Sequence, residues 1–426
     1  MMNETTISPT LQNMGIKAKR SSKELAKISS VLRNKALEAI AEALDSSQNV
    51  IIEANQKDIE IGNSAGLTEV TLDRLMLDTS RLNEIRDGVL VIASLPDPIG
   101  EEFDARTLEN GLKVARRRTP LGVIGSIYES RPNVTVDIAA LCLKSGNACV
   151  LRGGSESVHS NVALATLIRN TIGQVGVPRD CVQIVEDQNR SLISEMLTMK
   201  DYFDLLIPRG GADLIRFVGE NALMPVVTGG IGVCHLYVDK TSDLEMAKDI
   251  IRNAKVQRPT VCNALDAVLI HSSVANDLLP ELAKHLAGDG VELRCDTRSL
   301  SLLGEEKFSN VIQSDPSDWG TEFLSLILAV RIVDNLDEAL EHIDQYGGHS
   351  EAIITSDFEV AQRFLNEVDS SAVFVNASTR FNDGGQFGLG AEVAISTNKL
   401  HARGPMGVRE LTSYKWVVQG SGQIRE

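Results

Sequence analysis

The feature that most constrains the fold of this chain is a long alternation of strand-like and helix-like segments that begins near residue 122. Short apolar segments occur at 122–127, 148–152, 182–186 and 205–208, and helix-like stretches separate them, one of them at 134–144. Alternating β and α segments of this kind form a parallel sheet with helices on its faces. The pattern therefore predicts a first α/β domain here.

A second alternating region runs from Cys234 to about Val375, with apolar strands expected at 267–271, 325–332 and 352–355. Two α/β domains follow from the alternation, and the length of 426 residues suggests two or three domains. Helices are expected before this region, at 21–44, 50–61 and 80–93. The strand-like arm at 110–118 and tail at 411–418 have no evident partner within either domain.

The bulk composition is that of a globular enzyme, with 43% hydrophobic and 23% charged residues. The formal net charge of −16 argues against nucleic acid and anionic membranes as partners. No stretch has the length and apolarity of a membrane span or a signal peptide, so we expect a cytoplasmic protein. Six scattered cysteines predict free thiols, and dispersed histidines give no support for a metal site.

Cys262 is the residue most suggestive of chemistry, because it lies where a helix stops at Pro259 and a strand begins at Leu265. A thiol on such a loop can face a cleft, and the nearby Lys255 and Arg258 would stabilise a thiolate. Taken alone, a cysteine of this kind is more often a small buried hydrophobe than a nucleophile.

Three longer segments decide between these readings: 120–133, with the sequence PLGVIGSIYESRPN, 257–263, and 387–392 followed by 401–407. They resemble the gamma-glutamyl phosphate reductase family of the aldehyde dehydrogenase superfamily, in order and over nearly the whole chain. The resemblance implies an aldehyde dehydrogenase-like fold with two parallel-sheet α/β domains and a small β-flap for oligomerisation. It assigns 1–100 and 119–232 to cofactor binding, 233–385 to catalysis, and 101–118 with 400–426 to the flap.

By this resemblance Cys262 is the nucleophile and Asn133 stabilises the oxyanion. Asn133 follows Arg131-Pro132 at the end of a strand, where its amide could donate to a ligand. The competing interpretation is that Asn133 only caps the helix that starts at Val134.

Cofactor binding is expected at two strand ends, 152–155 and 208–211, and also at 228–230 and 322. Arg152 and Ser155 stand where the superfamily usually carries a lysine and a glutamate for the adenosine ribose, which favours NADPH over NADH because a guanidinium pairs with a 2′-phosphate. Glu156 could shift this register, and a simple glycine turn would explain the Gly-Gly pair. The expected cofactor-binding residues are Arg152, Gly153, Ser155, Pro208, Arg209, Gly210, Gly211, Thr228, Gly229, Gly230 and Glu322.

Thr228 stands where oxidising relatives generally have a glutamate that activates water, so its identity favours a reductase, whose thioester must survive until hydride arrives. Glu322 resembles the glutamate that holds the nicotinamide ribose, although an exposed loop acid is the alternative. Substrate anions need cations, and the expected substrate-binding residues are Arg131, Lys255, Arg258, Arg380 and Arg403.

The implied reaction is NADPH-dependent reduction of L-glutamate 5-phosphate to glutamate 5-semialdehyde and phosphate through a thioester on Cys262, a step of proline biosynthesis. An aldehyde oxidiser of the same fold and a non-catalytic binding protein are the rival interpretations. A homo-oligomer is expected, and a transient contact with glutamate 5-kinase is a further hypothesis. The sequence does not fix the oligomer size.

Overall fold

The computed structural model describes residues 7–229, 232–304 and 308–425, and these form two compact units. Unit 1 comprises residues up to Thr228 together with 388–394 and the segment from Met406 onward, and unit 2 comprises 229–387 and 395–405. Among the described residues no helix is long and apolar enough to cross a membrane. The α/β class predicted from the alternation is confirmed by a parallel sheet in each unit.

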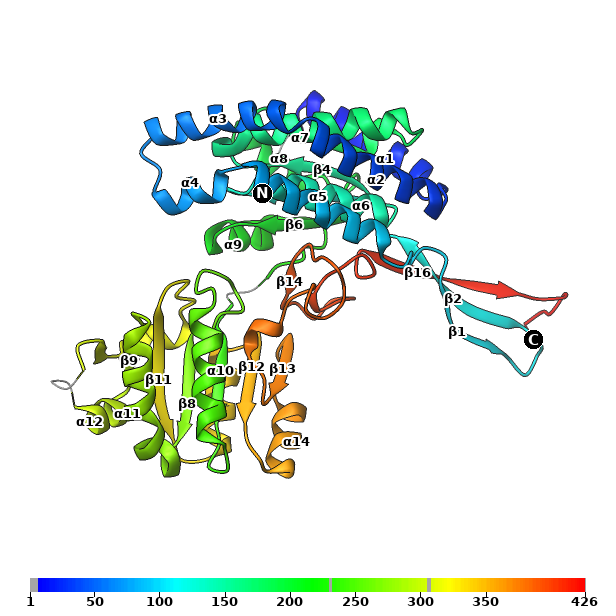
Figure 1. The fold of residues 1–426 in the computed structure, drawn as a ribbon. Coiled ribbons are helices and arrows are strands. Elements are labelled where there is room, and N and C mark those ends of the chain that lie inside the picture. Colours follow the sequence, from blue (N-terminus) through cyan, green and yellow to red (C-terminus); the bar gives the residue numbers. More distant parts are fainter. Residues whose placement is uncertain (1–6, 230–231, 305–307, 426) are drawn as a thin grey trace, which may run out of the picture. The chain divides into compact units, whose positions relative to one another are not determined.

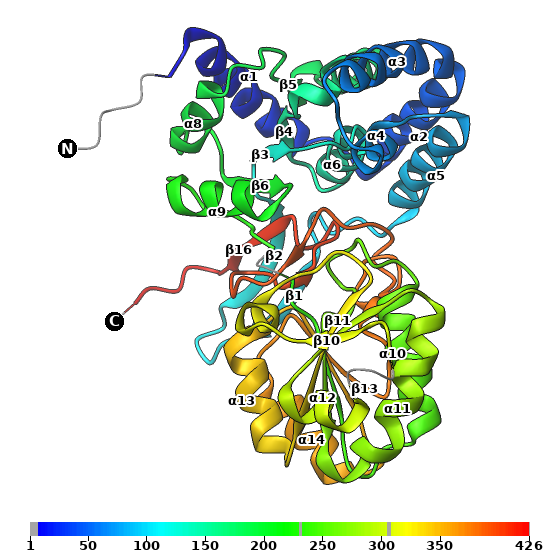
Figure 2. The same ribbon diagram turned by 90° about the vertical axis from the view of Figure 1, so that its left-hand side faces the viewer.

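Unit 1 contains a four-stranded sheet in the order β5-β4-β3-β6, in which all neighbours are parallel. Its strands are almost wholly buried because helices cover the sheet, as Figures 1 and 2 show. The strands are β3 (Val123–Tyr128), β4 (Ala148–Arg152), β5 (Val182–Ile184) and β6 (Leu205–Arg209). The helices are α1 (Pro9–Leu25), α2 (Ser30–Ser46), α3 (Gln48–Ser64), α4 (Glu69–Leu75), α5 (Thr79–Ser94), α6 (Asn133–Lys144), α7 (Val158–Gln174), α8 (Ser191–Thr198) and α9 (Ala212–Asn221).

The single helix expected at 21–44 is two helices, α1 and α2. The side chain of Ser29 accepts a hydrogen bond from the backbone N–H of Leu32, so Ser29 starts α2 as its N-cap. The helix pattern of apolar residues continues across the break, which is why periodicity alone predicted one helix.

The arm and the tail, which appeared to lack partners, pair with each other. The strands β1 (Glu102–Thr107), β2 (Lys113–Pro120) and β16 (Thr412–Gln419) form an antiparallel sheet in the order β1-β2-β16 within unit 1. Arg116 stacks over the rings of Tyr414 and Trp416 on this sheet. Figure 1 shows the three strands extending away from the helices of the unit.

Unit 2 is built on a seven-stranded parallel sheet in the order β10-β9-β11-β8-β7-β12-β13. Helices α10, α11 and α12 pack on one face and α13 and α14 on the other, each over its own apolar cluster (Figure 2). The strands are β7 (His235–Val238), β8 (Ala267–His271), β9 (Glu292–Cys295), β10 (Val311–Gln313), β11 (Ile327–Val333), β12 (Ser350–Ile354) and β13 (Ala372–Val375). A separate two-stranded antiparallel sheet is formed by β14 (Ile395–Ser396) and β15 (Gly404–Pro405). The helices are α10 (Leu244–Val256), α11 (Ser272–Gly288), α12 (Thr297–Leu303), α13 (Leu336–Tyr346) and α14 (Phe358–Glu367).

Candidate active site

In unit 1 the candidate residues gather at the carboxyl ends of β3, β4 and β6, the edge where parallel sheets bind ligands. Two carboxylates hold the loops at this edge. Glu156 Oε1 accepts hydrogen bonds from the backbone N–H of Ser130 at 2.6 Å and from its hydroxyl at 2.9 Å. Glu129 Oε2 accepts the backbone N–H of Gly211 at 2.9 Å. The loop after β3 is thereby connected to the loops after β4 and β6.

Glu156 has a structural task that the sequence did not reveal. It supports Ser130 in a left-handed conformation, with φ of 48°, which is uncommon for a residue other than glycine. A Cβ on Gly154 would lie 2.2 Å from Glu156 Oε1, so a side chain at this position would displace the Glu156 carboxylate from Ser130. Because the Glu156 carboxylate is engaged with Ser130, the structure gives no support to a shifted register in which Glu156 would hold a ribose.

Asn133 is the first residue of α6, and its side chain does not cap the helix. The N-cap is Pro132, which makes no side-chain cap bond, and Asn133 Nδ2 donates instead to Asp137 Oδ2 at 2.9 Å. The primary amide has a second N–H, which is not used by this bond. The capping interpretation is therefore wrong, and the arrangement leaves a donor for a ligand.

Asp137 is half-buried, one helical turn after Asn133. Burial raises the pKa of its carboxyl to about 6, although the hydrogen bond from Asn133 and the charge of Arg209 act in the opposite direction. A carboxyl group with a raised pKa beside an amide donor marks this part of the edge as a candidate binding site.

Arg152, at the end of β4, is buried. Its guanidinium donates to the carbonyls of Gly153 at 3.0 Å and Gln188 at 3.2 Å, while its buried Nε has no hydrogen-bond partner in the described part of the chain. Burial lowers its pKa, and the neighbouring charge of the exposed Arg190 lowers it further, against the opposing effect of Glu156. Ser155 is exposed directly after this loop. Two guanidinium groups thus lie near one another here.

The guanidinium of Arg209, at the end of β6, donates to the carbonyl of Val393 at 2.6 Å. This bond joins β6 to the segment 388–394 of the same unit. Thr228 is half-buried and ends the main part of unit 1, shortly after Val226, which makes a parallel bridge to Leu206. Gly229 belongs to unit 2, and Gly230 lies outside the described residues.

In unit 2, Cys262 lies in the loop between α10 and β8, as the sequence predicted. None of the six cysteines forms a disulfide, and Cys262 is half-buried whereas the other five are buried. Its backbone carbonyl accepts a hydrogen bond from Cys234 Sγ at 3.1 Å. The next residue, Asn263, donates from Nδ2 to the carbonyl of Asn382 at 3.0 Å and accepts at its own carbonyl from Thr379 Oγ1 at 2.8 Å. The loop is therefore fixed on both sides while the thiol keeps some access.

Lys255 does not reach solvent. Its ammonium donates to the carbonyl of Leu265 at 2.7 Å and lies 3.8 Å from Asp266 Oδ1, with the side chain fully buried. Burial lowers the pKa of Lys255, and burial raises the pKa of Asp266 to about 7. Direct contact of Lys255 with a substrate does not fit this position, and the geometry indicates support of the nucleophile loop.

Glu322 lies close to the nucleophile loop and is not an exposed loop acid. A Cβ on Gly232 would lie 2.9 Å from both Glu322 Oε1 and the Cys262 carbonyl oxygen, so both groups lie next to Gly232. Burial raises the pKa of Glu322. The following residue, Phe323, donates its backbone N–H to Asp266 Oδ1 at 3.1 Å, so Asp266 supports both loops.

The expected substrate cations of unit 2 differ in availability. Arg380 lines a cavity of about 170 Å³ with Gln257, whose Oε1 accepts from Arg380 Nε at 3.0 Å. Burial lowers the pKa of Arg380, and the charges of Arg258 and Cys262 are close enough to contribute. Arg258 is exposed, whereas Arg403 is paired with Asp369 at 2.5 Å. Arg131 is half-buried in unit 1.

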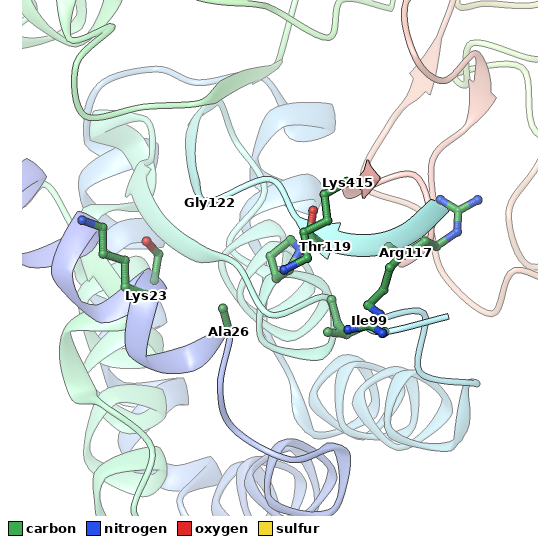
Figure 3. A pocket seen from close by; sticks show the side chains of 11 residues that line it. Lys23, Ala26, Ile99, Arg117, Thr119, Gly122 and Lys415 are labelled. Atoms are coloured by element: carbon green, nitrogen blue, oxygen red, sulfur yellow. The ribbon is translucent and has the colours of Figure 1, made fainter. Parts of the chain in front are cut away.

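A cavity of about 370 Å³ in unit 1 lies elsewhere (Figure 3). It is lined by Lys23, Arg117, Lys415 and Gly122, and Gly122 precedes β3 whereas Asn133 follows it. The cavity is therefore at the opposite end of that strand from the candidate site. Arg117 is paired there with Glu102 at 2.5 Å.

Sequence reasoning missed several residues that organise the site, chiefly Asp137, Glu129, Asp266 and Arg190. Asp137 could have been found, because it follows Asn133 by four residues and so lies on the same helix face. Glu129 and Asp266 act on segments distant in the chain, and no local pattern reports such contacts.

Comparison with known proteins agrees with this geometry. Residues 10–296 match the model of the aldehyde dehydrogenase family. The chain is 54% identical over 419 residues to the gamma-glutamyl phosphate reductase of Roseiflexus castenholzii, covering 97% of this chain and 99% of that protein. It is 52% identical to the protein of that name from Psychromonas ingrahamii, with coverage of 97% and 99%.

Among solved structures, the gamma-glutamyl phosphate reductase of Thermotoga maritima superposes with a TM-score of 0.95 at 44% identity, covering 98% of this chain and all of that one. The chain belongs to the aldehyde dehydrogenase family and, within it, to the gamma-glutamyl phosphate reductases.

Proposed function

We propose that this protein reduces L-glutamate 5-phosphate to glutamate 5-semialdehyde and inorganic phosphate, with Cys262 as nucleophile and NADPH as reductant. The observation that carries the proposal is the position of Cys262, the one cysteine of the chain that is not buried, on a loop fixed by Cys234, Asn263 and Lys255. Family membership supplies the class of reaction, because these relatives are named as reductases of this acyl phosphate.

The steps follow from the chemistry of a thiolate and an acyl phosphate. The Cys262 sulfur forms a bond to the carbonyl carbon, and the bond from that carbon to the phosphate oxygen breaks, so phosphate leaves with the electron pair and takes up a proton. NADPH, which Arg152, Arg190 and Glu322 would hold, would supply a hydride to the thioester carbon. The carbon–sulfur bond then breaks, which releases the aldehyde and restores the thiolate.

Asn133 is proposed to stabilise the oxyanion in both addition steps. Its amide keeps one N–H for this task, since the other is held by Asp137 at 2.9 Å. A donor already oriented by a second bond stabilises developing charge without reorganising during the reaction.

Thr228 bears on the direction of the chemistry. A carboxylate at this position could activate water against the thioester, and threonine cannot act as such a base. The absence of a base protects the acyl-enzyme until it is reduced.

NADPH is proposed over NADH because two guanidinium groups, Arg152 and Arg190, lie near the loop after β4. The buried Nε of Arg152 has no hydrogen-bond partner among the described residues, as expected for a group that awaits an acceptor. The glutamate carboxylate of Glu322 is proposed to hold the nicotinamide ribose, and Arg380 the α-carboxylate of the substrate. Arg131, Arg258 and Arg403 remain weaker candidates for the anionic groups.

We also propose a cytoplasmic homo-oligomer formed through the sheet β1-β2-β16. Its edge strand β16 carries the exposed side chains Tyr414, Trp416 and Val418 (45%, 48% and 55% exposed), and an exposed edge strand is commonly covered by a partner. Contact with glutamate 5-kinase stays a hypothesis.

The decisive assay runs the reaction in reverse, with purified protein, NADP⁺, glutamate semialdehyde and phosphate. NADP⁺ reduction should require phosphate, because only acyl-phosphate chemistry consumes it. Equal rates with and without phosphate would favour an aldehyde oxidiser instead, and no reduction under either condition would favour a binding protein.

A further inference from the structure

The carboxylate of Asp137 has no cationic partner among the residues that the structure describes. It accepts one hydrogen bond, from Asn133 Nδ2 to Oδ2, and no hydrogen bond to Oδ1 is present among the described residues. Within the part of the chain that the structure describes, no lysine, arginine or histidine nitrogen lies within ion-pair distance of it. The charge of Arg209 lowers the pKa of Asp137, but the Arg209 guanidinium donates its hydrogen bond to the Val393 carbonyl.

Burying an ionised carboxylate in this way costs folding free energy unless a cation binds to it. Partial burial disfavours the ionised carboxylate, and a neutral amide offsets this only in part. A positively charged group placed at Oδ1 would stabilise the carboxylate and would leave the bond to Asn133 intact. The position thus has the chemistry of a cation-binding site next to the proposed oxyanion donor.

The substrate of the proposed function carries such a cation. The α-ammonium of a glutamyl group is separated from the reacting carbonyl carbon by a short saturated chain, which spans about 5 Å when extended. Asn133 and Asp137 are neighbours with their polar atoms 2.9 Å apart, so a ligand of this length can place its carbonyl oxygen at Asn133 and its ammonium at Asp137. No other half-buried carboxylate in unit 1 both contacts Asn133 and keeps an oxygen for a ligand among the described residues.

We propose that Asp137 binds the α-ammonium of the glutamyl substrate and thereby selects an amino acid over a simple dicarboxylic analogue. The inference rests on the proposed function and goes further, since it names the group that recognises the amino end of the substrate. Asp137 orients Asn133 through one oxygen and receives the ammonium at the other.

The alternative is that Asp137 only orients Asn133. The two roles differ in substrate dependence. Loss of an orienting residue impairs every aldehyde that reacts at Cys262, whereas loss of an ammonium site impairs only substrates that have an ammonium.

The experiment compares glutamate semialdehyde with 5-oxopentanoate, which is the same aldehyde without the amino group, in the phosphate-dependent reduction of NADP⁺ by full-length protein. Asp137→Asn keeps the shape and the acceptor for Asn133 but removes the charge. We expect kcat/KM for glutamate semialdehyde to fall by about tenfold or more, mainly through KM, while the value for 5-oxopentanoate stays within about twofold. The exposed Asp344→Asn, on α13, serves as the matched control and should behave as the wild type.

Equal losses with both aldehydes, or no loss with either, would overturn the ammonium site. If Asp137→Asn does not fold, two other measurements test the same preference for an amino group. One is the activity of Asp137→Glu, which retains the charge. The other compares inhibition of the wild type by L-glutamate and by glutarate. Equal inhibition by the two acids would contradict the proposal. Failure of the proposed function would look different, because wild-type protein would then show no phosphate-dependent reduction of NADP⁺ with either aldehyde.

Discussion

The ammonium of Lys255 and the carboxylate of Asp266 lie 3.8 Å apart in a site that is almost closed to solvent. Lys255 also holds the carbonyl of Leu265, next to the nucleophile loop, and Asp266 accepts the backbone N–H of Phe323, next to Glu322. One buried pair thus supports both the proposed nucleophile and the proposed ribose-binding residue.

Lys255→Met should therefore destabilise unit 2 and disturb catalysis together. Removing one partner leaves Asp266 charged or protonated in a buried site, and such changes cost about 3 kcal/mol of unfolding free energy. Urea denaturation measures this loss, with the exposed Lys284→Met on α11 as the control. A loss below about 1 kcal/mol, or full activity in the variant, would show that the pair is not required.

Asn133→Ala should lower turnover by about a hundredfold or more, the usual effect of removing one oxyanion donor. NADPH affinity, measured by fluorescence titration, should change little because the amide does not hold the cofactor. A variant that binds NADPH normally and turns over at the wild-type rate would refute the role of Asn133.

The pKa of Asp137, raised to about 6 by burial, predicts opposite pH trends in activity and stability. Protonation below about pH 6 should weaken ammonium binding, so kcat/KM for glutamate semialdehyde should fall on the acid side, and this limb should be absent in Asp137→Asn. The neighbouring groups that act on this carboxyl are Asn133 and Arg209, and both oppose the raised pKa.

The free energy of unfolding should change with pH in the direction opposite to kcat/KM. A carboxyl whose pKa is higher in the folded state than its usual value of about 4 favours folding at low pH, and this contribution is lost as the pH rises through about 6. The unfolding free energy of the wild type relative to Asp137→Asn should thus decrease between pH 4 and pH 7. A constant difference across that range would contradict the raised pKa.

Arg190→Ala should weaken NADPH binding by about tenfold while NADH binding changes little, since only NADPH has a 2′-phosphate. Arg190 is the cleaner test of this site because Arg152 is buried and holds two backbone carbonyls, so its replacement would also disturb the fold. Equal weakening of both nucleotides would place the 2′-phosphate elsewhere.

How far the sequence predicts this structure depends on how local each signal is. The bounds of β4 and β8 were predicted exactly as found, because short apolar segments between turns carry their own signal. The pairing of β2 with β16 was missed, since it joins residues far apart in the chain, such as Lys113 and Gln419.

In the candidate site, too, residues with a local sequence signal were predicted and residues that act through distant contacts were not. Cys262 and Asn133 were found through motifs, but the burial of Lys255 was not, although the residue follows Ile251 by four positions and so shares the buried face of α10. Applying helical spacing to charged residues as well as apolar ones would have identified it. The contacts of Glu156 and Asp266 connect distant segments, so only the fold reveals them.

Cys262 is proposed to form the covalent intermediate, and Cys262→Ala tests this role, with the buried Cys295→Ala as control. Cys262→Ala should lose phosphate-dependent turnover by at least about a thousandfold, bind NADPH within about twofold of the wild type, and stay folded. The control should keep its activity. Residual turnover of Cys262→Ala above about a tenth of the wild-type rate would contradict the account, because no other cysteine of the chain is accessible enough to replace it.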